Sequence, residues 1–313
     1  MDKIQKWLQT TEYKDFSLSI ASADASFRKY YRLKKSEQSF ILMDSSLERE
    51  SLKPFLDVTQ RLLAQDVKAP NIYLQDLELG YLILEDFGDT NLLDILNKSN
   101  FEKLYKKAMQ EIITMQKSDS SSLAQYDADF LHFEMDLMQE WYLQKNLSIK
   151  LNDAEIKLLQ TSLKSISKVV LSQPQNIFVH RDFHSRNIMI TDNKELGVID
   201  YQDAMSGSLT YDLVSLLKDC YISFEREKIE KIALTFRDNK QITVSDSEFL
   251  KWFDFTGLQR HIKVLGVFSR LSIRDKKDGY LKDIPLVLSY TIETASRYEE
   301  TREFAEFLKR VTQ

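Results

Sequence analysis

The sequence predicts an α+β protein with two lobes, a strand-rich N-terminal lobe and a mainly helical C-terminal lobe. Three observations indicate this fold. Strand-like runs dominate the first 85 residues, helical spacing of apolar residues takes over from about residue 90, and three short strand-like runs interrupt the helices between 176 and 202. We expect the N-terminal lobe to span 1–88 and the C-terminal lobe 89–313, with a ligand in the cleft between lobes.

The N-terminal lobe is expected to contain strands around one helix. The alternation of Phe16, Leu18 and Ile20 with polar residues predicts a half-buried strand. Residues 27–33 and 39–43 predict a hairpin across the polar segment 34–38. Two further short strands are expected at 72–74 and 81–84. A helix is expected over 51–65, and the residues that should face inward are Leu52, Phe55, Leu56, Leu62 and Leu63.

The C-terminal lobe is expected to be helical with one small β insert. Phe133, Leu137 and Trp141 recur every four residues and should share one helical face. The apolar rhythm of 152–172 predicts an amphipathic helix with Asn152 or Asp153 as its N-cap. The β insert should comprise the runs 177–179, 188–191 and 196–199, and the pattern is helical again over 210–313.

The composition excludes several classes of protein. The 43 basic and 48 acidic residues give a formal net charge of −5, which is not the electrostatic footprint of a nucleic-acid-binding protein. A single cysteine, Cys220, excludes a disulfide framework and a cysteine-based zinc site. No apolar run approaches the roughly 18 residues of a membrane span. Because no apolar segment follows the basic residues at the N-terminus, we expect a cytoplasmic protein.

The scarcity of glycine limits how a nucleotide could be held. The seven glycines make up about 2% of the 313 residues, whereas glycine usually makes up about 7% of a protein. No two of them are closer than eight residues, so neither the G-x-G-x-x-G fingerprint nor the P-loop exists in this chain. Any bound nucleotide must be held in another way.

One stretch has the residues that phosphoryl transfer requires. His180, Arg181, Asp182 and Asn187 form the pattern H-R-D-x-x-x-x-N, and Asp200 follows thirteen residues after Asn187. Asp182 could accept the proton of an attacking hydroxyl, and Asn187 and Asp200 offer oxygen ligands to Mg²⁺. This is the pattern of the protein-kinase catalytic loop and its metal-binding aspartate.

Around these residues the sequence resembles a known family. The segments 180–187 and 200–203 resemble the aminoglycoside phosphotransferase branch of the protein-kinase-like fold. Further blocks at 25–33, 41–44, 82–88, 210–219 and 259–271 are similar to the bacterial anomeric kinases that phosphorylate N-acetylmuramate and N-acetylglucosamine at C1. The resemblance spans about residues 20–290. It implies a two-lobed kinase-like fold, ATP and Mg²⁺ as cofactors, Asp182 as catalytic base and Asn187 and Asp200 as metal ligands.

The resemblance also assigns nucleotide contacts. It places the interlobe segment, whose backbone binds adenine, at 84–87, with Glu85 and Phe87; the Glu85 side chain could equally be solvated. Met43 stands where kinases have an ATP-gripping lysine, as in the close family, and 23–28 replaces the glycine-rich loop. The replacement cation is sought among Arg28, Lys29 and Arg32, and Arg28 is preferred because it lies at the expected loop turn. All three could also be ordinary strand-edge charges. The nucleotide-binding set is therefore Ser26, Phe27, Arg28, Arg32, Met43, Glu85 and Phe87.

For the acceptor, the C-terminal lobe offers several candidates. We expect substrate contacts from Glu134, His184, Asp203 and Arg260, although His184 is also explained as a satisfied loop residue. Arg260 begins a basic run that could bind the lactyl carboxylate of N-acetylmuramate or form a solvated helix face. Asp212 matches the helix residue that braces the catalytic loop in kinase-like proteins. The family pattern has glycine at the position of Lys276, so the loop there should differ.

The sequence thus predicts an ATP- and Mg²⁺-dependent kinase that acts on the anomeric hydroxyl of N-acetylmuramate or N-acetylglucosamine in cell-wall (peptidoglycan) sugar recycling. A second possibility is a phosphotransferase of the same fold that acts on an aminoglycoside, choline or a homoserine-like alcohol. A third is a pseudokinase-like binding protein, which Met43 suggests and the presence of Asp182, Asn187 and Asp200 disfavours. The expected partner is a small-molecule amino sugar, with no nucleic acid and no membrane. The sequence carries no signal of oligomeric state.

Overall fold

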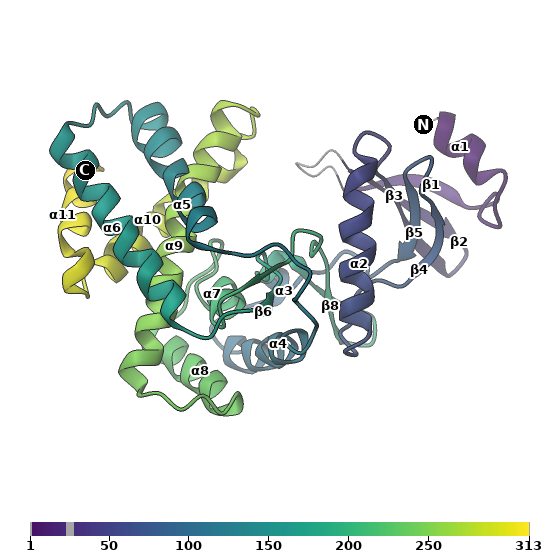
Figure 1. Ribbon diagram of the computed structural model, residues 1–313. Coiled ribbons are helices and arrows are strands. Elements are labelled where there is room, and N and C mark those ends of the chain that lie inside the picture. The colour runs from purple at the N-terminus through teal and green to yellow at the C-terminus, as the bar shows by residue number, and fades with distance from the viewer. Residues whose placement is uncertain (1, 23–27, 313) are drawn as a thin grey trace. The chain divides into compact units, whose positions relative to one another are not determined.

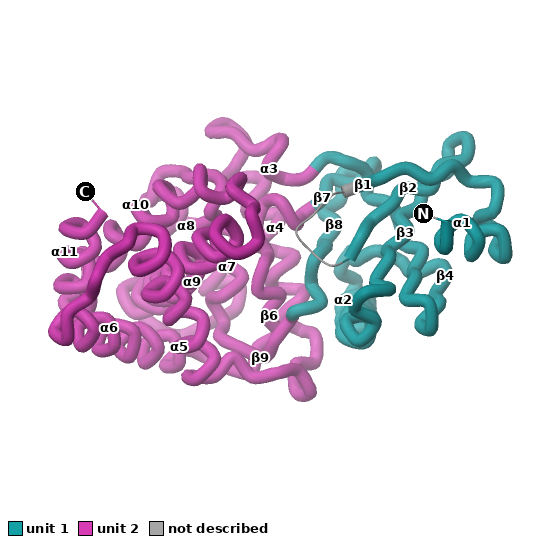
Figure 2. The backbone as a smooth tube through the Cα atoms, turned by 90° about the horizontal axis from the view of Figure 1, so that it is seen from above, with its two compact units in different colours: residues 1–90, 189–203 teal, residues 91–188, 204–313 magenta. Residues whose placement is uncertain are grey.

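The computed structural model describes residues 2–22 and 28–312, and its contacts divide the chain into two compact units. Unit 1 comprises residues 1–90 and 189–203, and unit 2 comprises 91–188 and 204–313, as Figure 2 shows by colour. We expected the N-terminal lobe to end at residue 88. The structure adds to it the segment 189–203, a strand pair that lies far along the chain.

Unit 1 is built on a five-stranded antiparallel sheet in the order β1-β2-β3-β5-β4 (Figure 1). The predicted hairpin is confirmed by the pairing of β2 with β3, in which Tyr30 lies opposite Met43. The strands and helices of the unit are α1 (Asp2–Leu8), β1 (Ser17–Ser22), β2 (Lys29–Lys35), β3 (Gln38–Asp44), a 3₁₀ turn (Arg49–Ser51), α2 (Leu52–Leu63), β4 (Ile72–Asp76), β5 (Tyr81–Glu85) and β8 (Leu196–Val198), and it also contains most of β7 (Ile188–Ile190).

Two expectations about buried side chains in unit 1 are wrong. Ile20 is 68% exposed, because it lies on the edge strand where the register between β1 and β2 shifts. Leu63 is exposed at the end of α2, whose buried face instead contains Val58 and Thr59 between Phe55 and Leu62. Leu63 lies at the end of its helix and Ile20 at a register irregularity, and at both places the regular spacing no longer decides what is buried.

Unit 2 is organised around α9 (Asp246–Ile273), a helix of 28 residues whose side chains are buried on nearly every side. Helices α5, α6, α7, α8 and α10 all pack against it (Figure 1). The elements of unit 2 are α3 (Leu92–Ile95), α4 (Phe101–Met115), α5 (Ala128–Leu137), a π-helix (Met138–Asn146), α6 (Asp153–Ser172), β6 (Ile177–Val179), a 3₁₀ turn (Ser185–Asn187), β9 (Met205–Gly207), α7 (Tyr211–Leu217), α8 (Arg226–Asn239), α9, a 3₁₀ segment (Asp278–Asp283), α10 (Ile284–Ala295), a 3₁₀ turn (Glu299–Thr301) and α11 (Arg302–Val311).

The helix expected over 152–172 is confirmed as α6, with Asn152 as the N-cap in a capping box with Glu155. The face predicted from Phe133, Leu137 and Trp141 is wrong, since Phe133 is 61% exposed. The helix changes from α to π after Leu137. Residues spaced by four therefore no longer share one face beyond that point. Trp141 is partly exposed, and the ammonium of Lys145 lies 3.5 Å from the centre of its ring.

None of the helices within residues 2–22 and 28–312 is long and apolar enough to cross a membrane.

Candidate active site

The H-R-D segment directly follows β6, which pairs antiparallel with β9. The loop is drawn into a compact turn by bonds to one carbonyl group. Both the backbone N–H of His184 and the side-chain amide of Asn187 donate to the carbonyl oxygen of Asp182, at 2.9 and 3.0 Å. The amide nitrogen of Asn187 faces Asp182, which makes its amide oxygen the atom that can serve as a ligand.

Arg181 adopts a left-handed backbone conformation with φ of 76°, which is unfavourable for a residue with a side chain. Buried Asp212, at the start of α7, accepts hydrogen bonds from the backbone N–H groups of His180 and Arg181, at 2.8 and 3.0 Å. Arg260 of α9 and Ser215 of α7 donate to the carbonyl oxygen of Arg181, at 2.5 and 3.2 Å. The strained peptide is therefore held on both sides, which is the kind of contact that the resemblance implies for Asp212.

A buried charge network lies behind the loop. The Glu134 carboxylate, which is 3% exposed, is 2.7 Å from the Arg181 guanidinium and 3.0 Å from the Lys263 ammonium. It also accepts hydrogen bonds from the Tyr126 hydroxyl and the Gln259 amide. Burial alone would raise the pKa of Glu134, but Lys263 and Arg181 outweigh it, so the pKa lies below the ordinary 4.5. Glu134 was predicted to bind substrate, and its described contacts are all with protein groups.

Asp182 lies in a field of positive charge. Its side chain is 39% exposed, and its carboxylate is 3.5 Å from the guanidinium of Arg260. Burial acts to raise the pKa of Asp182, but the charges of Lys263 and Arg260 outweigh it and hold the pKa well below the ordinary value. The carboxylate is therefore ionised at neutral pH, which is the form that can accept the proton of a hydroxyl group. Arg260, predicted as a substrate contact, is 2% exposed and holds the loop and Asp182.

The second half of the loop is tied to the segment after α7. Asp219 accepts hydrogen bonds from the backbone N–H and the hydroxyl of Ser185, at 2.8 and 2.5 Å. The same carboxylate accepts a bond of 3.0 Å from the N–H of Tyr221. The His184 ring meets the Tyr221 ring edge-on at 5.3 Å. These contacts place Tyr221 beside His184, which lies on the loop that contains Asp182.

In unit 1, Asp200 follows strand β8 and, like Arg181, has a left-handed backbone, with φ of 65°. It is exposed, and its carboxylate accepts a hydrogen bond of 2.9 Å from the Gln202 amide. The adjacent Tyr201 is fully buried, stacks on Phe55 at 5.3 Å and bonds to the Thr59 hydroxyl. Tyr201 thus fixes the turn that contains Asp200 to helix α2. Asp203, predicted to contact substrate, is exposed.

Met43 is completely buried in β3. The Arg28 guanidinium donates to the hydroxyl and carbonyl oxygens of Ser51, both at 3.3 Å. Arg32 is ion-paired with Asp86 and Asp89, both at 2.6 Å. Two of the three cations considered as replacements for the kinase lysine therefore have protein partners, and Lys29 is exposed on β2. Ser26 and Phe27 lie outside the described residues.

The segment after β5 is held in place by ion pairs. Glu85 is paired with Lys68 at 2.5 Å and accepts a hydrogen bond of 2.6 Å from Asn71. Its side chain is therefore anchored within unit 1. Phe87 is buried against Gly197, where a Cβ atom would come within 2.5 Å of the Phe87 ring. That position requires glycine because any side chain would displace the ring.

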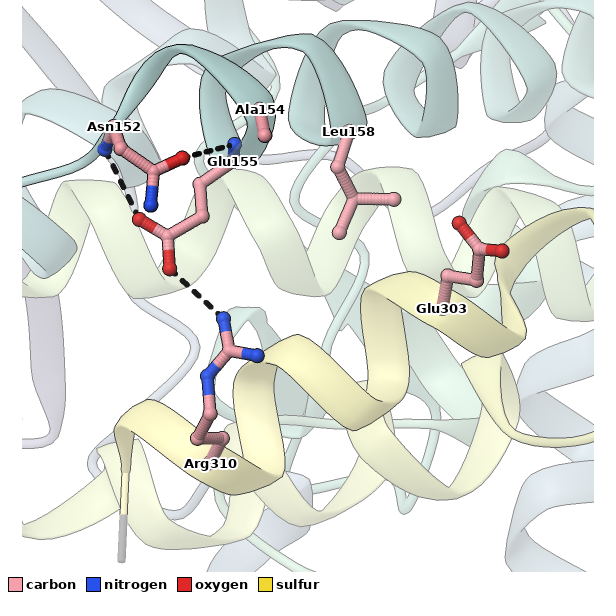
Figure 3. Close-up of a pocket in the computed structure, with 6 residues that line it drawn as sticks. All are labelled: Asn152, Ala154, Glu155, Leu158, Glu303 and Arg310. Atoms are coloured by element: carbon pink, nitrogen blue, oxygen red, sulfur yellow. Dashed lines mark hydrogen bonds and ion pairs between the residues drawn. The ribbon is translucent and has the colours of Figure 1, made fainter.

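A hollow between α6 and α11 is drawn in Figure 3. Three of its polar residues are bonded to one another, since Glu155 both closes the capping box with Asn152 and pairs with Arg310 at 2.8 Å. It includes none of the predicted site residues. Within residues 2–22 and 28–312, no three acidic, histidine or cysteine side chains gather in a way that could hold a metal ion. The loop around Asp182 is accordingly the candidate active site.

Several residues around this loop were not predicted from the sequence. Lys263 belongs to the basic run that begins at Arg260, and Asp219 to the family block at 210–219, but neither was singled out. The signal for Asp219 was its spacing, seven residues after Asp212, which places both at the two ends of the short helix α7. No local pattern marks Arg181 as left-handed, because that conformation is imposed by the groups around it.

The comparison with known proteins agrees with the fold and the loop. The model of the phosphotransferase enzyme family matches residues 17–238. The chain belongs to this family: it is an enzyme that uses ATP to phosphorylate a hydroxyl group. Among solved structures, an ADP-bound aminoglycoside phosphotransferase APH(2'')-Ib has a TM-score of 0.64 at 17% identity over 93% of this chain and 98% of that one. The choline kinase LicA from Streptococcus pneumoniae has a TM-score of 0.63 at 14% identity, with the same coverage. The predicted two-lobed kinase-like fold is confirmed.

Closer relatives share more of the sequence. The chain is 35% identical to the N-acetylmuramate/N-acetylglucosamine kinase of Neisseria meningitidis serogroup B over 310 residues, which cover 95% of this chain and 92% of that protein. It is equally similar to the enzyme of the same name from Pseudomonas aeruginosa, over 94% of this chain and 88% of that one. The family resemblance found in the sequence is confirmed.

Proposed function

We propose that this chain transfers the γ-phosphoryl group of ATP to the anomeric hydroxyl of N-acetylmuramate and N-acetylglucosamine. The observation that carries the proposal is the 35% identity, along nearly the whole chain, to kinases named for these two sugars. The C1 position is supported by the resemblance of the blocks around the catalytic loop to anomeric kinases. Because ATP is the donor, we place the reaction in the cytoplasm, where it would return cell-wall sugars to use.

In this proposal, Asp182 orients the C1 hydroxyl and accepts its proton as the O–P bond forms. A carboxylate with a depressed pKa is a weak base, which suits this reaction for two reasons. An anomeric hydroxyl is more acidic than an ordinary alcohol, and phosphoryl transfer passes through a loose transition state that needs positioning more than early deprotonation. The bonds from His184 and Asn187 to the Asp182 carbonyl keep the carboxylate in place.

The donor set of the motif fits Mg²⁺. The amide oxygen of Asn187 and the carboxylate of Asp200 are hard oxygen ligands, and Mg²⁺ in kinases is typically held by two such groups together with phosphate oxygens. Bound there, the ion would neutralise charge on the phosphates. The hydrogen bond from Asn187 to Asp182 would then link the position of the ligand to that of the base.

The experiment measures ADP release with ATP and Mg²⁺ against a panel of acceptors: N-acetylmuramate, N-acetylglucosamine, the 1-O-methyl glycoside of N-acetylglucosamine, an aminoglycoside, choline and homoserine. We expect turnover of the two free sugars only, and a product that has lost its reducing power and is hydrolysed by mild acid. Turnover of the methyl glycoside at a comparable rate would exclude phosphorylation at C1. Turnover of choline, homoserine or the aminoglycoside alone would assign the chain to another acceptor.

A further inference from the structure

Asp283 has a carboxylate oxygen that the fold does not use. It is the last residue of the 3₁₀ segment and the N-cap of α10, a position where aspartate usually accepts a bond from the first turn of the helix. Here the side chain makes no capping bond. Its Oδ2 atom is shielded from solvent and has no hydrogen-bond partner among the described residues. Because buried polar atoms are almost always bonded, this oxygen is a candidate for contact with a ligand.

Arg186 brings a cation to the same region. It lies in the 3₁₀ turn of the catalytic loop, one residue before Asn187. Its guanidinium carbon is 3.6 Å from the centre of the Tyr221 ring. Within the described part of the chain no hydrogen bond or ion pair engages this guanidinium. Stacking on Tyr221 restricts the side chain while leaving its N–H groups to donate.

The 3₁₀ segment that contains Asp283 packs on α9 and connects to Tyr221 through the ring of Phe268. Tyr280 packs on Phe268 with 5.2 Å between ring centres, and Phe268 stacks on Tyr221 at 6.4 Å. The charge of Arg186 also acts on Asp283: burial, the larger influence, raises the pKa of Asp283, and Arg186 lowers it. The acceptor Asp283 thus lies within electrostatic reach of the donor Arg186, and Arg186 shares the Tyr221 ring with His184, which is on the loop that contains Asp182.

The charges in this region indicate what kind of ligand group it binds. Besides burial, which raises the pKa of Asp283, the charges of Arg186 and Lys282 lower this pKa and the charge of Asp219 raises it. The two carboxylates and the two cations offset one another, so an added carboxylate would gain no net attraction here. A neutral group with both a donor and an acceptor, such as a hydroxyl or an acetamido group, would satisfy the aspartate and the arginine together.

We propose that Asp283 and Arg186 bind the neutral polar groups shared by N-acetylglucosamine and N-acetylmuramate, their acetamido group and ring hydroxyls. Asp283 accepts a hydrogen bond from the sugar and Arg186 donates one, while Tyr221 holds the arginine in position. The inference rests on the proposed function, since it names residues that would recognise the acceptor. It assigns no role here to the lactyl carboxylate, which distinguishes the two sugars.

The test is Asp283→Asn, assayed with both sugars. Losing a hydrogen bond to a charged acceptor should raise the KM for each sugar about tenfold or more, and by a similar factor for the two. The KM for ATP should not change. Because Oδ2 has no protein partner, the melting temperature without sugar should be equal to or above that of the natural protein, which a structural role for Asp283 would not allow. The stabilising effect of added sugar on the melting temperature should decrease.

The matched control is Asp278→Asn. Asp278 begins the same 3₁₀ segment, is exposed and accepts a bond from the Ser272 hydroxyl, so removing its charge should leave both sugar KM values unchanged. A second variant, Arg186→Gln, should raise the KM of both sugars as Asp283→Asn does.

Unchanged sugar KM values in Asp283→Asn would overturn the inference, as would a change confined to N-acetylmuramate or a lower melting temperature. If the natural protein phosphorylates neither sugar, it is the proposed function that fails, and the assay separates the two failures.

Discussion

Replacing Glu134 with glutamine tests the buried charge network directly. Glu134 is 3% exposed and lies between two cations, Arg181 at 2.7 Å and Lys263 at 3.0 Å. Glutamine has nearly the same shape and keeps one oxygen acceptor, so the substitution removes the charge and replaces the other acceptor oxygen with an amide NH₂. It leaves two buried cations beside each other without the carboxylate that neutralises them.

The expected loss of unfolding free energy in Glu134→Gln follows from that arrangement. Removing one partner of a buried ion pair typically destabilises a protein by about 3–5 kcal/mol, because the remaining charge is uncompensated. Since glutamine can still accept from Arg181, we expect a value near the lower limit, about 3 kcal/mol. The Arg181 peptide, with φ of 76°, should also be less well fixed, so kcat should fall. The KM for sugar should change little if Glu134 acts through the loop.

The pH dependence has a defined sign. Because the folded-state pKa of Glu134 lies below its ordinary value of 4.5, its ionised form contributes stability that is fully present above about pH 4.5 and is lost as the pH falls through the lower folded value. The difference in unfolding free energy between the natural protein and Glu134→Gln should therefore be constant from pH 6 to 8. This difference in unfolding free energy should become smaller below about pH 4.5.

The assay is urea unfolding combined with steady-state kinetics. Adding Lys263→Met to Glu134→Gln removes one of the stranded cations, so the double variant should be more stable than the sum of the single effects by about 1 kcal/mol or more. The control is Arg274→Gln, at the exposed C-cap residue of α9, and it should change neither stability nor kcat. A Glu134→Gln protein within 1 kcal/mol of the natural one, with a sugar KM raised tenfold, would refute this reasoning and make Glu134 a substrate contact.

Three further predictions follow from the loop and its surroundings. Asp182→Asn should lower kcat roughly 10²–10⁴-fold with sugar and nucleotide affinity nearly unchanged, and more than a tenth of the natural kcat would argue against its role as base. Asp212→Asn should lower the unfolding free energy by about 1–3 kcal/mol and reduce kcat, because an amide replaces one of two acceptor oxygens; equal stability in urea would contradict the bracing role. Lys276→Gly should leave the melting temperature equal or higher, since Lys276 has a φ of 58° that glycine adopts without strain, and a clear decrease would show that its side chain matters.

The sequence predicted the elements best where the pattern is long and regular. The helix α6 and the hairpin of β2 and β3 follow from repeated apolar spacing and from a capping residue or a polar turn, which are local properties. Phe133 shows the opposite case. Its place in a helical rhythm predicted burial, but the buried face of α5 includes the charged Glu134 instead. A carboxylate is tolerated there only because Arg181 and Lys263, distant in sequence, compensate it.

The site shows the same division between local and distant causes. The spacing from His180 to Asn187 and on to Asp200 is a property of one continuous segment, so the sequence by itself determined the class of chemistry and the fold family. The partners of that segment are dispersed along the chain: Glu134 on α5, Asp212 on α7 and Arg260 on α9. No local pattern connects them. The depressed pKa of Asp182, the left-handed Arg181 and the unbonded oxygen of Asp283 were decided only by tertiary structure, because each depends on charges and contacts that packing brings together.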